Sequence, residues 1–168
     1  MQPSEVSRFE EVDVNEIQTF LKACWLDSYT GILPDSAISK VIDRWQSKDA
    51  IIRAVQNARL FYAGWKEQGK LLRLVSAGKI DEETIKIYQL YVLPSHQRKG
   101  IGTKLMDAAT RFFRNSKKIV LEVEEGNEKG LAFYRKYGFS YPKKTLVEVD
   151  GDKIPCLLGE LELSVTMS

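Results

Sequence analysis

The sequence has few residues of the kinds that build cross-links and metal centres. Among its 168 residues are two cysteines, Cys24 and Cys156, and a single histidine, His96. Two cysteines far apart and outside any metal-ligand spacing argue against a disulfide framework and a structural zinc site. We therefore expect two free thiols and no bound metal.

Long apolar runs and a strong excess of one charge are also missing. No signal peptide, basic block or apolar run of membrane-spanning length is present, and the formal net charge is only +2. We therefore expect a cytoplasmic protein with neither a membrane nor a nucleic acid as partner. The length and the ordinary hydrophobic share of 43% indicate one domain that spans residues 1–168.

The spacing of apolar residues predicts a mixed α/β chain. A strand over Arg8–Val12 precedes a helix for which Asp13 and Glu16 form a capping pair. The order is then helices, three strands, a helix, a strand, a helix and two strands. The further ranges are helices to Ser28, over 35–45 and over 47–57, strands 60–66, 70–78 and 85–93, a helix from 102, a strand 119–124, a helix 128–137, and strands 139–149 and 153–163.

The most informative stretch is Ile85–Met106, which indicates a strand, a tight loop and a helix. The loop carries Arg98 and Lys99 beside two glycines, Gly100 and Gly102. Glycines at a helix start let a phosphate approach the free N–H groups there, and the cations add attraction. On this pattern alone, an ordinary turn with solvated cations explains the loop equally well. The spacing is neither that of a P-loop nor that of a dinucleotide fingerprint.

Two sequence blocks resemble the GNAT family of acyl-CoA-dependent N-acetyltransferases. Gln97-x-x-Gly100-x-Gly102 matches the family signature Arg/Gln-x-x-Gly-x-Gly/Ala after a strand. Residues 127–139 are similar to the family's Asn-x-x-Ala-x-x-Phe-Tyr-x-x-x-Gly-Phe, with Gly130 where alanine is usual. The resemblance implies the GNAT fold, a seven-stranded mixed sheet that is splayed between its fourth and fifth strands and flanked by helices.

The resemblance also implies how acetyl-CoA is bound as cosubstrate. Its pyrophosphate would lie on the backbone of the loop and helix start, which comprise Gln97, Arg98, Lys99, Gly100, Ile101, Gly102 and Thr103. Its pantetheine arm would follow the strand at Leu90, Tyr91 and Val92, where a bulge would aim the amide of Val92 at the thioester oxygen. Asn127 would hold the arm, cap its helix or do both. Lys129 and Lys136 either approach the phosphates or are solvated.

Catalysis needs an acid for the departing thiolate and a base for the attacking amine. A phenol stays protonated at neutral pH, so the family match assigns Tyr134 as the acid, although its helical spacing alone favours a core tyrosine. The fourth strand has no carboxylate that could serve as base. Either the amine arrives deprotonated, or a water relays its proton to Glu122, Glu124, Glu82 or Glu83; for Glu122 and Glu124 a solvated edge is the alternative.

The acceptor side is expected to be aromatic. Trp25 and Tyr29 are spaced to share one helix face and project one ring into the cleft, whereas Phe20 and Trp45 are expected in the core. The acceptor residues are then Trp25, Tyr29, Gln89 and Glu122, with Asp27 nearby. The run 29–34 resembles PaiA-type polyamine acetyltransferases, which implies spermidine or spermine as the small-molecule amine.

Two other functions remain open at this stage. An enzyme of the same fold could acetylate a protein N-terminus or a lysine, which requires a more open acceptor groove. A regulator could bind acyl-CoA without chemistry, but it would not need a phenol near the sulfur. The sequence leaves open whether the protein is a monomer or a homodimer.

Overall fold

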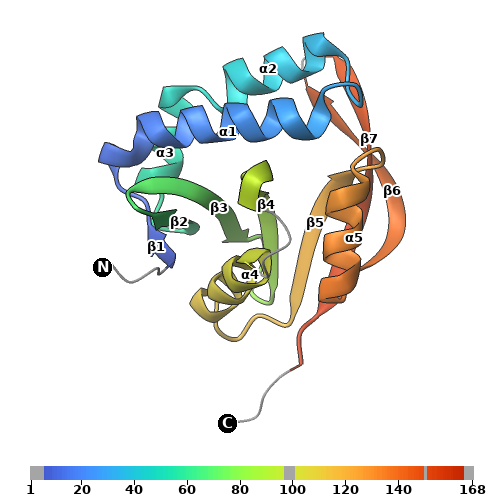
Figure 1. Cartoon of the computed structure of the whole chain (residues 1–168). Coiled ribbons are helices and arrows are strands. Elements are labelled where there is room, and N and C mark those ends of the chain that lie inside the picture. The colour runs from blue at the N-terminus through green and yellow to red at the C-terminus, as the bar shows by residue number, and fades with distance from the viewer. Residues whose placement is uncertain (1–5, 97–100, 150, 165–168) are drawn as a thin grey trace.

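The computed structural model describes residues 6–96, 101–149 and 151–164 and has one seven-stranded sheet between layers of helices (Figure 1). The strand order is β1-β2-β3-β4-β5-β7-β6. The strands are β1 (Val6–Arg8), β2 (Leu60–Glu67), β3 (Lys70–Lys79), β4 (Thr84–Val92), β5 (Lys118–Glu124), β6 (Ser140–Val149) and β7 (Asp152–Glu162). The helices are α1 (Val14–Tyr29), α2 (Asp35–Trp45), α3 (Lys48–Gln56), α4 (Ile101–Phe112) and α5 (Glu128–Tyr137), with two short 3-10 helices, η1 (Glu11–Asp13) and η2 (Pro94–His96).

The sheet consists of two antiparallel halves joined by one short parallel contact. β4 and β5 pair only from Thr84–Lys118 to Lys86–Val120. β4 otherwise pairs with β3, and β5 pairs with β7 along its length. The two central strands therefore separate after Lys86, which confirms the expected splay of the GNAT fold.

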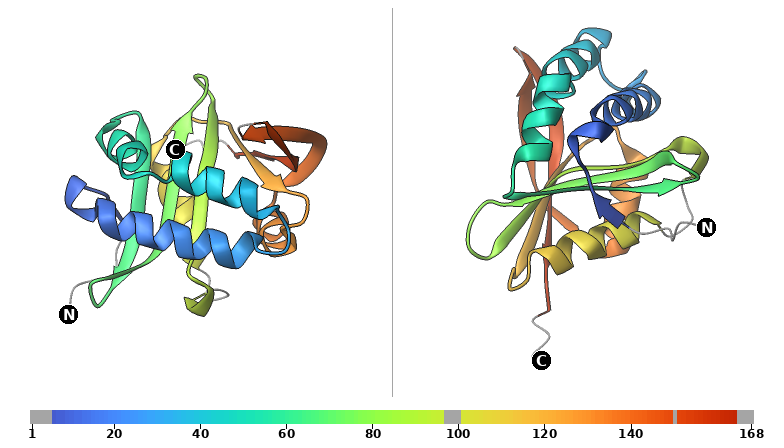
Figure 2. Two further views of the ribbon diagram at one scale, coloured as in Figure 1. Left: turned by 90° about the horizontal axis from the view of Figure 1, so that it is seen from above. Right: turned by 90° about the vertical axis from the view of Figure 1, so that its left-hand side faces the viewer.

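Helices cover both faces of the sheet (Figure 2). α1, α2 and α3 lie on one face, where Ile17, Leu21 and Leu74 belong to the same buried cluster. α4 and α5 lie on the other, where Leu105 and Leu131 pack with the inward residues of β2–β5. Each helix thus buries one apolar stripe, as the sequence periodicity predicts.

The ends of several elements follow local chemistry. Ser47 caps α3 by accepting a hydrogen bond from the Ala50 amide at 3.2 Å. Gly138, with φ of 126°, ends α5 in a conformation that other residues rarely adopt. The two hairpins β2–β3 and β6–β7 lie within a residue or two of the predicted ranges.

The N-terminal prediction was wrong. The strand is Val6–Arg8, and Glu11–Asp13 form η1 instead of extended chain. The reciprocal capping bonds join Glu10 to Asp13, whereas Glu16 accepts the Leu71 amide at 2.6 Å and pairs with Lys66. The predicted capping partner is thus drawn to the β2–β3 hairpin, a long-range contact that local spacing does not reveal.

Candidate active site

A cavity of about 1320 Å³ opens where β4 and β5 separate. Beyond Lys86 these strands no longer pair with each other, so Leu90 of β4 and Val123 of β5 face the cavity instead of a shared ladder. α1, α2, α4 and α5 complete its wall, together with residues of β6 and β7. The cavity exceeds the roughly 300–1,000 Å³ of a typical small-ligand site and has room for two substrates at once.

The predicted site residues that the structure describes come together around this cavity. They are Trp25, Tyr29, Gln89, Leu90, Tyr91, Val92, Gly102, Thr103, Glu122, Asn127, Lys129, Tyr134 and Lys136. Gln97, Arg98, Lys99 and Gly100 lie outside the described residues. Ile101 is the first residue of α4.

The start of α4 fits a phosphate group. Gly102 and Thr103 line the cavity in the first turn, where backbone N–H groups have no partner within the helix. A Cβ added at Gly102 would lie 2.8 Å from Cε2 of Phe133, so glycine is required for α4 to approach α5. Lys129 and Lys136 also line the cavity and add positive charge, and His96 is a further lining residue. The cavity therefore suits a long anionic ligand at this end.

Tyr134 of α5 presents a phenol to the cavity. Its hydroxyl has no hydrogen-bond partner among the residues that the structure describes, although its ring packs against Phe133 and Phe139. Burial, and secondarily the charge of Glu124, raises the pKa of Tyr134 above its ordinary value. The phenol is therefore protonated at neutral pH and can donate its proton to a bound group.

α1 spans the opening between the two halves of the sheet. Trp25 donates a hydrogen bond from Nε1 to the hydroxyl of Tyr91 on β4 at 2.7 Å. One turn later, Tyr29 donates from its hydroxyl to Oε2 of Glu124 on β5 at 2.8 Å. The two rings contact each other, with centroids 4.3 Å apart. This i, i+4 pair therefore fixes the separation of β4 and β5 beside the cavity.

Asn127 joins the start of α5 to the same network. Its Oδ1 accepts a hydrogen bond from the Gly130 amide at 3.0 Å, and its Nδ2 donates to the Tyr29 hydroxyl at 3.4 Å. The expected cap is therefore present. A Cβ at Gly130 would lie 2.7 Å from Asn127 Nδ2, so an alanine here would require the Asn127 amide to shift.

The four candidate base residues have different surroundings. Glu124 is half-buried against Tyr29, and burial raises its pKa. Glu122 lines the cavity but is exposed and pairs with Lys86 at 3.2 Å. Glu82 and Glu83 lie on the turn before β4, outside the cavity lining, and Glu83 pairs with Lys117. The geometry thus separates Glu124 from the other three.

Two predictions need correction, one about the burial of Trp45 and one about the position of the bulge in β4. Phe20 is buried, but Trp45 is 45% exposed, because the α2 face that buries Ile38 and Val41 reaches the cavity rim at the last turn. The bulge in β4 lies at Tyr88 and not at Leu90–Val92, because Ser76 pairs with Gln89 and Ala77 with Ile87. It turns the half-exposed Tyr88 ring to the cavity wall.

The turn between α1 and α2 meets the turn between β5 and α5 at the wall of the cavity. Ile32 of this turn packs on Gly126, where an added Cβ would lie only 2.5 Å from Ile32 Cγ2. Lys40 of α2 forms an ion pair with Asp152 of β7 at 2.8 Å. These contacts join the helices over one sheet half to the loops and strands of the other half.

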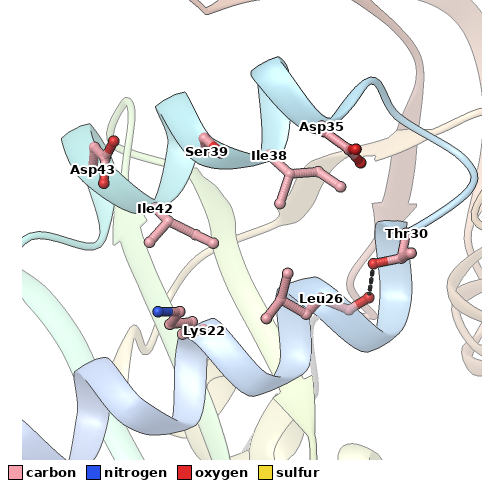
Figure 3. A pocket seen from close by; sticks show the side chains of 8 residues that line it. All are labelled: Lys22, Leu26, Thr30, Asp35, Ile38, Ser39, Ile42 and Asp43. Atoms are coloured by element: carbon pink, nitrogen blue, oxygen red, sulfur yellow. Dashed lines mark hydrogen bonds between the residues drawn. The ribbon is translucent and has the colours of Figure 1, made fainter.

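A smaller hollow of about 340 Å³ lies between α1 and α2 (Figure 3). The side chains of Leu26, Ile38 and Ile42 point toward one another across it, and Lys22 stands at its side. The Thr30 hydroxyl donates a hydrogen bond to the backbone carbonyl of Leu26. Because it lies outside the opening between β4 and β5, this hollow is separate from the site described above.

Among the described residues 6–96, 101–149 and 151–164, no group of three or more His, Cys, Asp or Glu residues is arranged to hold a metal ion. None of their helices is both long and apolar enough to cross a membrane. Cys24 and Cys156 are free and buried, as expected, and burial raises the pKa of each thiol to about 12.

Known proteins share this sequence pattern and fold. Residues 17–139 match the model of the acetyltransferase (GNAT) family. PaiA N-acetyltransferase from Thermoplasma acidophilum, solved in complex with coenzyme A, has a TM-score of 0.83 at 21% identity, covering 96% of this chain and 100% of its own. The structure of yncA from Salmonella typhimurium, which was solved with acetyl-CoA, has a TM-score of 0.72 at 19% identity and covers 99% of this chain and 98% of its own. The ribosomal-protein-S18-alanine N-acetyltransferase from Escherichia coli has a TM-score of 0.71 at 16% identity and covers 98% of this chain and 96% of its own.

Proposed function

The chain belongs to the GNAT acetyltransferase family, and from this premise we propose that it acetylates a primary amine of a small molecule. Acetyl-CoA is the donor, and a polyamine such as spermidine or spermine is the acceptor. The amine attacks the thioester directly in a ternary complex. The observation that carries the proposal is the cavity between β4 and β5. Its wall contains the half-buried carboxylate of Glu124 and the phenol of Tyr134, which has no hydrogen-bond partner among the described residues.

Coenzyme A would lie along the cavity from the start of α4 toward Tyr134. The N–H groups in the first turn of α4, near Gly102 and Thr103, would hold the pyrophosphate. The separated edges of β4 and β5 would accommodate the pantetheine arm beside Leu90 and Tyr91. Val92 would orient the thioester carbonyl. Asn127 already caps α5 and contacts Tyr29, so it would hold the N-terminal end of α5 in place more than it would bind the pantetheine arm.

Glu124 would take the proton from the attacking ammonium. It is half-buried in the cavity wall, and burial raises its pKa, which makes it a stronger base than an exposed glutamate. Tyr29 holds one of its oxygens by a hydrogen bond and so fixes its orientation. Glu122 is already paired with Lys86. Of the alternatives that the sequence leaves open, the structure thus supports Glu124 best.

Tyr134 would protonate the sulfur as the thioester bond breaks. The amine nitrogen forms the new C–N bond and releases its second proton to solvent, the C–S bond of the thioester breaks, and the phenol proton passes to the departing sulfur. The phenol is well suited because its raised pKa keeps it protonated until charge develops on the sulfur. Solvent then returns the proton to Tyr134.

A small cationic acceptor agrees with the charges around the cavity. The lining residues on α1, α2, β4 and β5 include Asp27, Glu122 and Glu124 but no Lys, Arg or His among the described ones. The aromatic rings of Trp45 and Tyr88 also line the cavity, and such rings favour cations. The resemblance of the run 29–34 to PaiA-type polyamine acetyltransferases agrees with this choice.

A folded protein or a peptide would fit this cavity less well than a small amine. The packing of Ile32 on Gly126 brings the α1–α2 turn against the β5–α5 turn over the acceptor end. An N-terminal acetyltransferase needs a groove that admits extended chain there. The closed arrangement therefore favours a flexible alkylamine over a protein acceptor.

The test is a screen for CoA release with the purified protein and acetyl-CoA. Spermidine and spermine are compared with monoalkylamines, with lysine and with peptides that carry free N-termini. The proposal predicts the highest kcat/KM for a polyamine. Acetylation of peptides without polyamine turnover would contradict the substrate class, and CoA binding without turnover of any amine would indicate a non-catalytic sensor.

A further inference from the structure

Gln46 is a buried polar residue in the cavity wall whose side chain has no partner. It follows directly after α2, where its amide donates to the Val41 carbonyl at 3.2 Å and its carbonyl accepts from Gln18 Nε2 at 3.0 Å. Its backbone is therefore fixed. The residue is 1% exposed, yet neither Nε2 nor Oε1 of its side chain forms a hydrogen bond in the described structure.

Such a group is unusual in a folded protein. Buried side-chain amides nearly always have at least one hydrogen-bond partner, because an unpaired one loses its hydration without compensation. An apolar residue at this position would pack without that loss. The unpaired carboxamide therefore points to a partner that binds in the cavity, whose lining also includes Trp25, Trp45 and Tyr88.

The surrounding charges indicate which partner it is. The described lysines of the cavity wall, Lys129 and Lys136, lie on α5. Gln46 belongs to the other side, formed by α1, α2, β4 and β5, whose lining includes Asp27, Glu122, Glu124 and several aromatic rings. An ammonium group is attracted to this side and can donate a hydrogen bond to the carboxamide oxygen.

We propose that Gln46 is a specificity residue that binds the second nitrogen of a diamine or polyamine whose first nitrogen is acetylated near Glu124. This inference rests on the proposed function and deepens it. The neutral carboxamide would accept a hydrogen bond from the ammonium through Oε1. An acceptor with one nitrogen gains nothing from this contact, so Gln46 distinguishes polyamines from monoamines.

The experiment compares the parent protein with Gln46→Met and Gln46→Glu, using spermidine and butylamine as acceptors. Gln46→Met keeps the side-chain length but removes both polar atoms. It should raise the KM for spermidine roughly ten- to a hundredfold and leave the butylamine kinetics unchanged. Gln46→Glu should lower the KM for spermidine, because a carboxylate binds an ammonium more strongly than an amide does.

Matched controls separate this role from a structural one. Gln56→Met makes the same change on α3, outside the cavity lining, and should leave the KM values for spermidine and butylamine unchanged. Gln46→Met should unfold at the same temperature as the parent or higher, because it removes an unpaired buried amide. A lower melting temperature with equal losses for both acceptors would mean that Gln46 is structural and would overturn the inference.

The remaining outcomes are equally decisive. If Gln46→Glu raises the KM for spermidine as Gln46→Met does, the partner is not a cation and the inference fails. If Gln46→Met still prefers spermidine as the parent does, Gln46 does not bind the acceptor. Failure of the proposed function is recognised separately, because the parent protein itself would then acetylate other amines but no polyamine.

Discussion

At the scale of single residues, Tyr134 should control turnover without controlling cofactor affinity. Replacement of Tyr134 by Phe removes the proton donor but keeps the ring that packs on Phe133 and Phe139. We expect kcat to fall about 10²- to 10⁴-fold, with the Kd for acetyl-CoA nearly unchanged. Tyr62→Phe removes a hydroxyl from the opposite core and is the matched control. Undiminished kcat in Tyr134→Phe would show that another group protonates the sulfur.

Glu124 should control the pH dependence of activity. Glu124→Gln can still accept the hydrogen bond from Tyr29 but cannot take a proton. We expect kcat/KM at neutral pH to fall about 10²- to 10⁴-fold and to recover as the pH rises, because the amine then arrives already deprotonated. Parallel pH profiles for the variant and the parent would contradict the assignment.

The same substitution gives an independent signal in thermal unfolding. Because burial raises its pKa above about 4.3, Glu124 stabilises the fold when protonated and loses that contribution as the pH rises through the folded-state pKa. Glutamine imitates the protonated form at every pH. Glu124→Gln should therefore melt above the parent at pH 7, and the difference should shrink toward pH 4. A difference that grows in acid would have the wrong sign.

At the scale of elements, the contact of the α1–α2 turn with the β5–α5 turn should govern acceptor binding. Gly126→Ala places a Cβ where Ile32 now packs and should cost about 1–3 kcal/mol of stability. It should raise the KM for the amine more than the KM for acetyl-CoA, because the displaced turn covers the acceptor end.

Ile32→Ala supplies the missing space and serves as the matched control. The double variant Gly126→Ala with Ile32→Ala should recover most of the stability lost by Gly126→Ala alone, as residues in direct contact do. Additive losses in chemical denaturation would mean that the two residues act independently, and would remove the support for a packed cover.

Most elements could be predicted because their signals are local. The alternation in β2–β3 and β6–β7 and the glycine that ends α5 gave boundaries within a residue or two. The N-terminal strand and its cap could not be predicted, because Glu16 contacts the amide of Leu71, 55 positions away. Short-range spacing carries no information about such a contact.

The site residues that belong to a sequence motif could be predicted, whereas those outside a motif could be predicted only in part. The two motif blocks led to Tyr134, Asn127 and Gly102. Glu122 and Glu124 share a strand face, so spacing cannot rank them; only the reach of Tyr29 and the position of Lys86 separate them. Gln46 has no sequence signal, because its burial depends on how α2 ends beside the cavity.

At the scale of the whole molecule, the two sheet halves lose their shared strand pairing along the cavity. Their links include the short β4–β5 ladder, the ion pairs of Lys86 with Glu122 and of Lys40 with Asp152, and the two hydrogen bonds from α1. A ligand that fills the opening should therefore stabilise the entire fold. At one hundred times its Kd, acetyl-CoA should add about 2.7 kcal/mol and raise the melting temperature by about 5–10 °C.

Pantetheine is the control for this measurement. It lacks the pyrophosphate that the start of α4 would hold, so it should give a much smaller shift at equal concentration. Equal shifts for the two ligands would mean that the start of α4 does not contribute to binding.

The central claim is that the opening between β4 and β5 brings the thioester to Tyr134, and a crystal structure with bound coenzyme A tests it most directly. We expect the pyrophosphate at the first turn of α4, the pantetheine arm between the separated strands, and the sulfur within hydrogen-bond distance of the Tyr134 hydroxyl. Coenzyme A bound outside this opening, or a sulfur directed away from Tyr134, would contradict the account.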